Sequence, residues 1–158
     1  ILNEMDDYLS RMLKQDSNGE DVNDGMDMSL CMIDHKNGTL SFSGAQNSGL
    51  LFKNGEVINL TASKYTVGGL LAGTEKQFET HTLPISKSDL VYLYTDGYQD
   101  QFGGKKGKKF YRKNLLKLIE SVQHLPLEKQ LQTIQTTFLN WKGELPQVDD
   151  VSVVGFRI

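Results

Sequence analysis

The sequence predicts an α+β fold in which antiparallel strands are flanked by helices. Between residues 25 and 60, apolar residues alternate with polar ones in short segments separated by turn residues, which is typical of antiparallel strands. At the beginning of the chain, and again between residues 115 and 141, apolar residues recur every three or four positions, which is typical of amphipathic helices. Together these segments predict one mixed domain over residues 1–158.

The composition limits the classes of function. A length of 158 residues is enough for one domain with a core, and a net charge of −3 gives no general attraction to nucleic acid or anionic lipid. No apolar run approaches the roughly 20 residues that span a bilayer, and no signal peptide is visible. The single cysteine, Cys31, fits a reducing compartment. We therefore expect a cytoplasmic protein, and the start at Ile1 in the middle of a pattern suggests a piece of a longer chain.

The first element is an amphipathic helix over residues 1–14. Its acidic residues come early and its basic residues late, which suits the helix dipole. Residues 16–24 form a polar segment that we interpret as a solvated loop. A calcium-binding EF-hand is the alternative, but its sixth and twelfth positions would hold Asp21 and Asp27 instead of glycine and glutamate.

The next elements are strands in an antiparallel meander. Methionine and leucine alternate with polar residues over 25–34, and we interpret this stripe as core, although it could also form a plastic binding surface. A second strand is expected over 39–45. Residues 49–60 form a hairpin around Asn54-Gly55, the pair favoured in a type I′ turn.

Residues 61–83 are less regular. Gly68-Gly69 permits a tight bend or a close backbone approach. A strand is expected over 77–83, ended by Pro84, and His81 within it is interpreted as structural because its neighbours form no metal-ligand spacing.

The most informative segment is the apolar run of residues 90–94, which stops at Thr95-Asp96-Gly97. A continuous apolar run of this length is typical of a buried strand. A carboxylate at the end of a core strand, followed by a glycine turn, is well held and still accessible. Asp96 is therefore a candidate metal ligand.

A second pair of carboxylates, Asp149 and Asp150, enters the last apolar strand, over 148–158. If this strand lies beside the one over 90–94, Asp96 and Asp149 meet at one end of the sheet. Converging carboxylates repel each other unless protons or a cation intervene. Ligands that offer only oxygen suit hard ions such as Mg²⁺ or Mn²⁺.

A basic segment with interleaved aromatic residues follows over 101–113. We interpret it as a flexible flap in which Lys105, Lys106 and Lys108 bind an anionic group of the substrate. A merely solvated loop and a nucleic-acid contact are the alternatives. The segment lacks the Walker pattern, because lysine stands at position 108 where that pattern needs its second glycine.

Two helices precede the last strand, over 115–122 and 127–141. In the second, one apolar stripe runs through five residues spaced by four and three, namely Leu127, Leu131, Ile134, Phe138 and Trp141. Packing on the sheet is the favoured interpretation, and a partner-binding helix is the alternative. Gly143 is the expected C-terminal stop.

Five motifs in this order resemble the SpoIIE-type branch of the metal-dependent (PPM) protein phosphatases. They are Asp24-Gly25-Met26-Asp27-Met28, Gly68-Gly69, Leu93-Tyr94-Thr95-Asp96-Gly97, Asp100-Gln101-Phe102-Gly103-Gly104, and Val148-Asp149-Asp150-Val151-Ser152-Val153. Each motif alone is weak, whereas the ordered set is specific. The resemblance extends from the first helix to the last residue.

The resemblance implies a β-sandwich flanked by helices, with a two-metal Mn²⁺ or Mg²⁺ centre. It implies hydrolysis of phosphoserine or phosphothreonine by a metal-activated water, without a side-chain nucleophile. It also implies an anti-anti-sigma (STAS-type) phosphoprotein substrate and an upstream sensor or receiver domain. By motif, Asp96 and Asp149 match metal-binding aspartates, and Asp150 is the fallback for Asp149.

The chain departs from the family pattern in one respect. It contains no Asp-x-x-Gly-His-Gly block, whose aspartate bridges both metals in the family. We therefore expect the C-terminal part of a phosphatase domain, weakly active or inactive alone, with an exposed sheet edge that favours a homodimer. A non-catalytic phosphatase-like binding module is the second hypothesis, and a nucleic-acid binder is the third.

Overall fold

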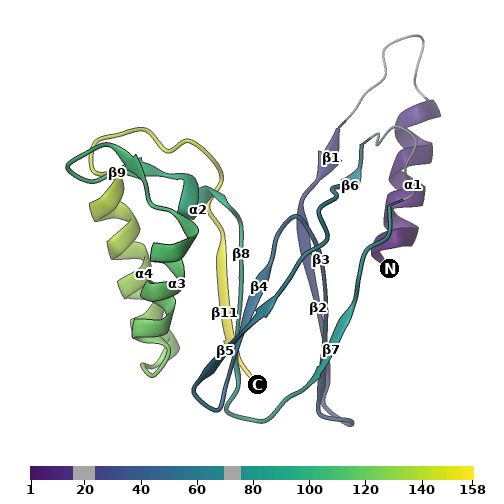
Figure 1. Ribbon diagram of the computed structural model, residues 1–158, viewed down its shortest axis with the longest axis horizontal. Helices are drawn as coiled ribbons and strands as arrows, with labels where there is room; N and C mark the ends of the chain where they lie inside the picture. Colours follow the sequence, from purple (N-terminus) through teal and green to yellow (C-terminus); the bar gives the residue numbers. More distant parts are fainter. Residues whose placement is uncertain (16–23, 70–75) are drawn as a thin grey trace. The chain divides into compact units, whose positions relative to one another are not determined.

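The computed structural model describes residues 1–15, 24–69 and 76–158. The predicted loop over 16–24 therefore lies almost wholly outside the described residues. The chain divides into two compact units (Figure 1). Unit 1 comprises Ile1–Gly49 and Asn59–Ser86, and unit 2 comprises Leu50–Ile58 and Lys87–Ile158. The organisation as one domain stays a prediction, and the units are described separately below.

The described residues of unit 1 form one helix and two small antiparallel sheets (Figure 1). The predicted first helix is confirmed as α1 (Leu2–Gln15). The strands of the three-stranded sheet follow the order β2 (Met28–Asp34), β3 (Thr39–Ala45) and β7 (His81–Pro84). The two-stranded sheet pairs β1 (Gly25–Met26) with β6 (Val67–Gly68).

One buried cluster of unit 1 includes the start of α1. It consists of Leu2, Ala45, Val67 and Phe78, against which one face of α1 and part of β2 pack, while Leu40 and Phe42 of β3 are also fully buried. The interpretation of the methionine stripe as core is wrong at two positions, because Met26 is 46 % exposed and Met32 is 56 % exposed. The single strand predicted over 25–34 is divided into β1 and β2, which belong to different sheets. Strand β2 is an edge strand, and Met28 and Leu30 are the members of the stripe that pack on the cluster.

Strand β7 is shorter than predicted. Residues 77–80 are not part of a strand, and Pro84 is the last residue of β7 instead of the residue that stops it. Phe78 is nevertheless buried, and its backbone N–H donates to the side-chain oxygen of Asn3 at 2.9 Å. Its backbone is thus satisfied by a side chain of α1 instead of by a neighbouring strand.

A buried lysine links α1 to the Gly68-Gly69 bend. The ammonium group of Lys76 contacts a carboxylate oxygen of Asp6 at 2.9 Å and also donates to the carbonyls of Thr66, Gly68 and Gly69. The same oxygen of Asp6 accepts the N–H of Gly68 at 2.7 Å. The expected bend is confirmed, because both glycines have positive φ angles, 74° and 72°.

Unit 2 contains the four-stranded sheet with the order β11-β8-β4-β5. These strands are β4 (Gly49–Lys53), β5 (Glu56–Leu60), β8 (Leu90–Tyr94) and β11 (Val153–Arg157). The hairpin prediction is confirmed, because Asn54 and Gly55 connect β4 to β5 with φ angles of 51° and 82°. Positive φ at both central residues is the signature of the type I′ turn.

Helices α3 (Arg112–Val122) and α4 (Leu127–Lys142) lie side by side and supply the other half of the unit 2 core (Figure 1). The core joins Leu50, Phe52 and Tyr92 of the sheet to helix residues such as Leu115 and Phe138. The expected C-terminal stop of α4 is confirmed, because Gly143 caps the helix with a φ angle of 54°.

The predicted stripe of α4 is correct only in its second half. Leu127 is 39 % exposed and Leu131 is 61 % exposed, whereas Ile134 is buried. The buried face instead begins at Gln130, whose side-chain oxygen accepts the hydroxyl of Tyr92. A glutamine can occupy a core position when its amide is fully hydrogen-bonded, and periodicity among apolar residues alone cannot detect this.

Two buried tyrosines should make the free energy of unfolding depend on pH. The hydroxyl of Tyr98 donates to the carbonyl of Ile134 at 2.8 Å, and that of Tyr92 to Gln130. Burial raises the pKa of Tyr92 to about 12 and raises the pKa of Tyr98 as well. In the unfolded chain both ionise near pH 10. The free energy of unfolding should therefore fall as the pH rises above about 10, because the unfolded state alone releases these protons.

Urea unfolding between pH 8 and about 11 tests this expectation. Tyr92→Phe should give a shallower fall in stability with pH, whereas Tyr111→Phe, at a tyrosine that is 55 % exposed, should leave the slope unchanged. If the free energy of unfolding fell with pH at the same slope in the unmodified chain and in both variants, the assignment of the pH dependence to buried tyrosine would be wrong.

Within the described ranges, no helix combines the length and the apolar character required to cross a bilayer.

Candidate metal centre

The pairing of β8 with β11 creates the candidate site. The two strands are antiparallel, with registered partners from Tyr94 and Val153 at one end to Leu90 and Arg157 at the other. Beyond the last pair, the N–H of Thr95 donates to the carbonyl of Ser152 at 3.0 Å. The expectation that these strands lie side by side is confirmed. Asp96 therefore follows the end of β8 at the edge where the Asp149-Asp150 segment enters β11.

Thr95 and Gly97 hold the two acidic segments together. The hydroxyl of Thr95 donates to the carbonyl of Asp150 and accepts the N–H of Ser152, both at 2.9 Å. Gly97 begins the short helix α2 (Gly97–Asp100), and a Cβ at this position would lie 2.3 Å from the carbonyl oxygen of Asp150. Glycine is therefore required because the neighbouring backbone occupies the space of a side chain.

The carboxylates at this edge are exposed and available. Asp96 occupies the N-cap position of α2, yet its side chain makes no capping hydrogen bond. Asp149 uses one oxygen to accept the N–H of Asp150 at 2.7 Å. Carboxylate oxygens of this kind fit the preference of Mg²⁺ and Mn²⁺. No group of three or more acidic, histidine or cysteine residues suited to a metal occurs in the described part of the chain, so the two aspartates stay candidate ligands.

The basic segment contains a short hairpin, which the sequence did not predict, and the flexibility of the flap stays a prediction. Its strands β9 (Phe102–Gly103) and β10 (Lys108–Lys109) pair antiparallel. The hairpin is fixed on α4, because the N–H of Gly104 donates to the carbonyl of Trp141 at 2.8 Å. A Cβ at Gly103 would lie 1.9 Å from that same carbonyl oxygen. The two glycines thus let the hairpin pack closely on the helix, and this tertiary contact orders the segment.

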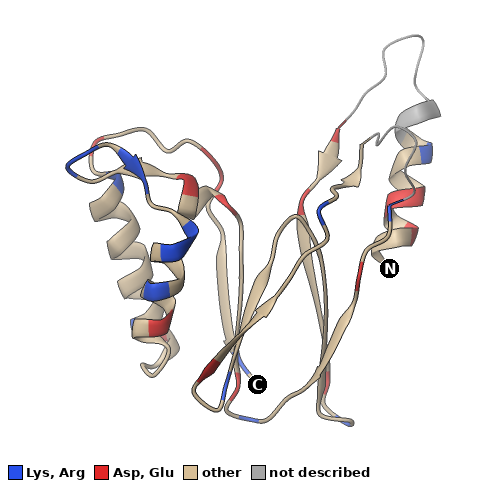
Figure 2. Ribbon diagram, in the orientation of Figure 1, with Lys and Arg blue, Asp and Glu red and all other residues tan. Residues whose placement is uncertain are grey.

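Positive charge gathers on this hairpin and at the start of α3, whereas acidic residues lie near α2 and in the segment leading to β11 (Figure 2). Lys105, Lys106 and Lys108 are exposed. Lys109 is different, because its ammonium group pairs with Asp100 at 3.1 Å and lies 5.9 Å from the ring centroid of Phe102. The three exposed lysines keep their charge available for an anion.

Gln101 is a residue that the sequence analysis missed. Its side chain is fully buried and hydrogen-bonds to the segment preceding Asp149. The signal in the sequence is weak, because Gln101 is a single uncharged polar residue between Asp100 and Phe102. Which distant backbone groups it satisfies follows only from the tertiary structure.

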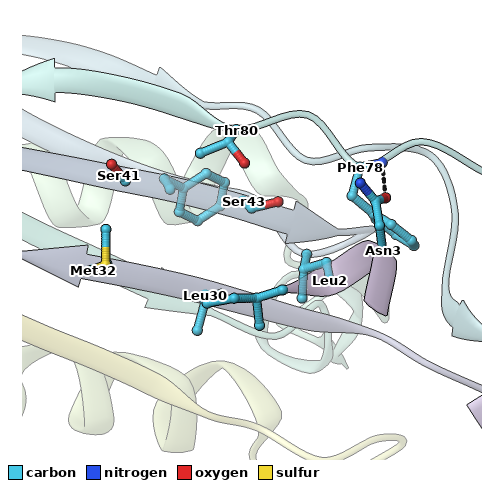
Figure 3. Close-up of a pocket in the computed structure, with 10 residues that line it drawn as sticks. Leu2, Asn3, Leu30, Met32, Ser41, Ser43, Phe78 and Thr80 are labelled. Carbon is cyan, nitrogen blue, oxygen red and sulfur yellow. Dashed lines mark hydrogen bonds between the residues drawn. The ribbon is translucent and has the colours of Figure 1, made fainter. Parts of the chain in front are cut away.

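Unit 1 contains a cavity of about 110 Å³ (Figure 3). Leu2 and Leu30 line it on one side, and the hydroxyls of Ser43 and Thr80 lie on the other. None of its ten lining residues carries an acidic, basic, histidine or cysteine side chain. His81 lies outside it and its ring contacts the carbonyl of Thr61 at 3.2 Å. The cavity therefore offers no group for acid–base or metal chemistry.

Comparison with solved structures defines the class of protein. The SiaA-PP2C domain of Pseudomonas aeruginosa matches with a TM-score of 0.85 and 27 % identity, over 99 % of this chain and 59 % of that one. The phosphatase domain of SpoIIE from Bacillus subtilis matches with a TM-score of 0.58 and 16 % identity, over 97 % of this chain and 64 % of that one. RsbX in complex with magnesium matches with a TM-score of 0.59 and 12 % identity, over 98 % of this chain and 61 % of that one. The chain therefore has the PP2C (PPM) phosphatase fold, mixed helices and antiparallel sheets, as predicted.

The sequence itself gives the family. The family model described as Stage II sporulation protein E (SpoIIE) matches residues 1–158, and the chain belongs to this family of PPM-type phosphatase domains. No curated protein matches the sequence closely enough to count as a relative. The chain spans less than two thirds of the length of each of the three structures above.

Proposed function

We propose that this chain carries part of the active site of a protein phosphatase that hydrolyses phosphoserine or phosphothreonine. The observation that supports this most is the pairing of β8 with β11, which brings Asp96 and the Asp149 segment to one edge of the sheet. The basic hairpin of the same unit is the second support. Membership of the SpoIIE family makes phosphoryl transfer the chemistry to test first.

Asp96 and Asp149 would hold Mn²⁺ or Mg²⁺, with Asp150 as the fallback for Asp149. When bound, a two-metal centre supplies Lewis acidity and an activated water for attack on phosphorus. Both carboxylates lie on ordered backbone, so they would hold the cations at the edge where β8 ends and β11 begins. RsbX, which shares the fold, was crystallised with magnesium, in line with this choice of ion.

The lysines of the hairpin would act on the substrate. Lys105, Lys106 and Lys108 are exposed and carry positive charge, which suits the phosphoryl group or acidic residues beside it. Because the hairpin is fixed on α4 through Trp141, its backbone needs little ordering when the substrate binds. No side-chain nucleophile is required in this scheme.

The proposed substrate is an anti-anti-sigma (STAS-type) phosphoprotein, and the proposed setting is a cytoplasmic signalling protein with an upstream sensor or receiver domain. This part of the proposal rests on family resemblance. We propose no contact with nucleic acid or membrane. The β11 edge of the unit 2 sheet has no further strand in the described part of the chain, and a homodimer that pairs these edges is the proposed assembly.

A second function, a phosphatase-like module that binds a phosphoprotein without turnover, is supported by the incomplete ligand set. Two carboxylates supply few of the ligands that a two-metal centre needs. We accordingly expect weak metal binding and slow turnover for the 158-residue chain. Release of phosphate from a phosphoserine STAS protein, with and without Mn²⁺, separates the two functions. Binding of the phosphoprotein without Mn²⁺-dependent release would favour the module.

The hairpin lysines give a prediction about substrate binding. Changing Lys105, Lys106 and Lys108 together to glutamine should raise KM for a phosphoprotein by about fivefold to tenfold and leave kcat nearly unchanged. The reason is that exposed charges contribute modest, salt-dependent binding energy. The increase in KM should shrink as the salt concentration rises.

A matched triple variant provides the control. Lys36, Lys64 and Lys87 are exposed lysines outside the hairpin, and changing them to glutamine alters the net charge by the same amount. An equal rise in KM for both triple variants would show that net charge, and not the hairpin, attracts the substrate.

A further inference from the structure

We propose that Gln101 is a positioning residue that holds the acidic loop, residues 143–150. In this conformation Asp149 lies at the metal edge, the edge of the sheet where β8 ends and β11 begins. The inference rests on the proposed function, since it takes Asp149 as a metal ligand. It assigns a role to a side chain that touches neither the metal edge nor the exposed lysines.

The amide of Gln101 is fully buried and every hydrogen bond it makes is to backbone. Its Nε2 donates to the carbonyl of Pro146 at 2.9 Å and to that of Phe102 at 3.0 Å. Its Oε1 accepts the N–H of Val148 at 3.3 Å. Donor and acceptor together therefore fix the loop at two points, two residues apart, directly before Asp149.

The backbone of Gln101 is itself anchored. Its carbonyl accepts the indole N–H of Trp141 at 3.0 Å and the N–H of Phe110 at 2.9 Å. Phe110 is buried in the unit 2 core and packs against Trp141 with a ring-centroid distance of 5.3 Å. The amide thus projects from a rigid part of the molecule, as a positioning group must.

The acidic loop needs such an attachment because it has little packing of its own. All its residues are exposed, including Leu145 at 42 % and Val148 at 51 %. The hydroxyl of Thr95 holds the far end of the loop at the carbonyl of Asp150. Gln101 holds the loop at Pro146 and Val148, so Asp149 lies between two fixed points.

Without Gln101, the segment from Pro146 to Val148 would lose its attachment, and metal binding would have to order it. The conformational entropy of that segment would then oppose binding. Residues that orient metal ligands typically contribute tenfold to a hundredfold to metal affinity. A second effect can be measured without metal. The carbonyl of Pro146 and the N–H of Val148 would lose their partner, so the amide hydrogens of the loop would exchange faster.

Gln130 offers a matched control. It is a buried glutamine of the same unit, its Nε2 donates to the carbonyls of Gln123 and Leu125, and its Oε1 accepts the hydroxyl of Tyr92. It connects the α3–α4 turn to the sheet instead of holding the acidic loop. Gln→Met removes the amide at either position and keeps an unbranched side chain of similar length.

The experiment compares Gln101→Met with Gln130→Met in the 158-residue chain. Titration with Mn²⁺ alone, followed by electron paramagnetic resonance, should show about tenfold weaker binding for Gln101→Met and less than a twofold change for Gln130→Met. Amide hydrogen exchange without metal should show faster exchange at Val148 and Asp150 in Gln101→Met alone. Both variants should lower the melting temperature.

Each outcome bears on the inference. Equal losses of Mn²⁺ affinity in the two variants, or unchanged loop exchange in Gln101→Met, would overturn it. Faster loop exchange together with selective loss of affinity would support it. If the unmodified chain binds no Mn²⁺, the proposed metal site fails, and the exchange data alone then decide whether Gln101 holds the loop. If Gln101→Met does not fold, Gln101→Asn, which keeps the charge unchanged and whose shorter amide is expected not to reach Pro146 and Val148, takes its place in the same comparison.

Discussion

Replacing Asp149 with asparagine should reduce Mn²⁺-dependent release of phosphate on the order of a hundredfold, and replacing Asp96 should have a similar effect. Each change removes a full negative charge from the edge where β8 and β11 end. A direct ligand is expected to contribute at least as much as the residues that orient it, which contribute tenfold to a hundredfold to affinity. The measurements are phosphate release from a phosphoserine protein and Mn²⁺ affinity.

Two comparisons make the result specific. Glu120→Gln removes the charge of an exposed acid on α3, and it should leave Mn²⁺ affinity unchanged. Asp150→Asn should have a smaller effect than Asp149→Asn. If Asp150 proves the more sensitive, the ligand is the second aspartate of the pair. If neither position nor Asp96 matters, the assignment of a metal to this edge is wrong.

Gly97→Ala should damage the same edge without touching a carboxylate. The added Cβ would lie 2.3 Å from the carbonyl oxygen of Asp150, which is backbone and cannot rotate away. Unit 2 must therefore separate the ends of β8 and β11, at a cost of about 1–3 kcal/mol in the free energy of unfolding. Mn²⁺ affinity should fall together with stability, because the two acidic segments move apart.

Gly155→Ala distinguishes this local effect from general destabilisation. Gly155 pairs with Tyr92 in the same two strands, and a Cβ there would lie 2.7 Å from the ring of Tyr92. Both variants should unfold at lower urea concentration, but only Gly97→Ala should lose more Mn²⁺ affinity than its stability explains. The same loss in both would mean that the site depends on the sheet as a whole.

The features that the sequence predicted well depend on local chemistry. Asn54-Gly55 specifies its own turn, and the apolar run before Asp96 specifies a buried strand regardless of its neighbours. Since the two longest apolar strands of the second half each border an acidic motif, their pairing could be anticipated. The sequence therefore predicted that the two acidic motifs meet at one end of the sheet.

The features that were missed depend on partners far away in the sequence. Gln101 and Gln130 are buried because distant backbone groups need their amides, and Lys76 is buried because Asp6 and three carbonyls surround it. The exposure of Met32 was missed because alternation identifies a strand without telling which part of it another element covers. The hairpin at 102–109 is ordered by contact with Trp141, which the basic composition does not reveal.

The interleaving of the two units has a consequence for dissecting the gene. Unit 2 takes its strands β4 and β5 from a segment that lies between two portions of unit 1. A fragment cut at Lys87 would retain both aspartates and the whole basic hairpin, yet it would lose Leu50 and Phe52 from beneath Tyr92. Unit 2 therefore cannot be transplanted as one uninterrupted stretch of polypeptide, and recombination that preserves it must carry residues 50–58 along.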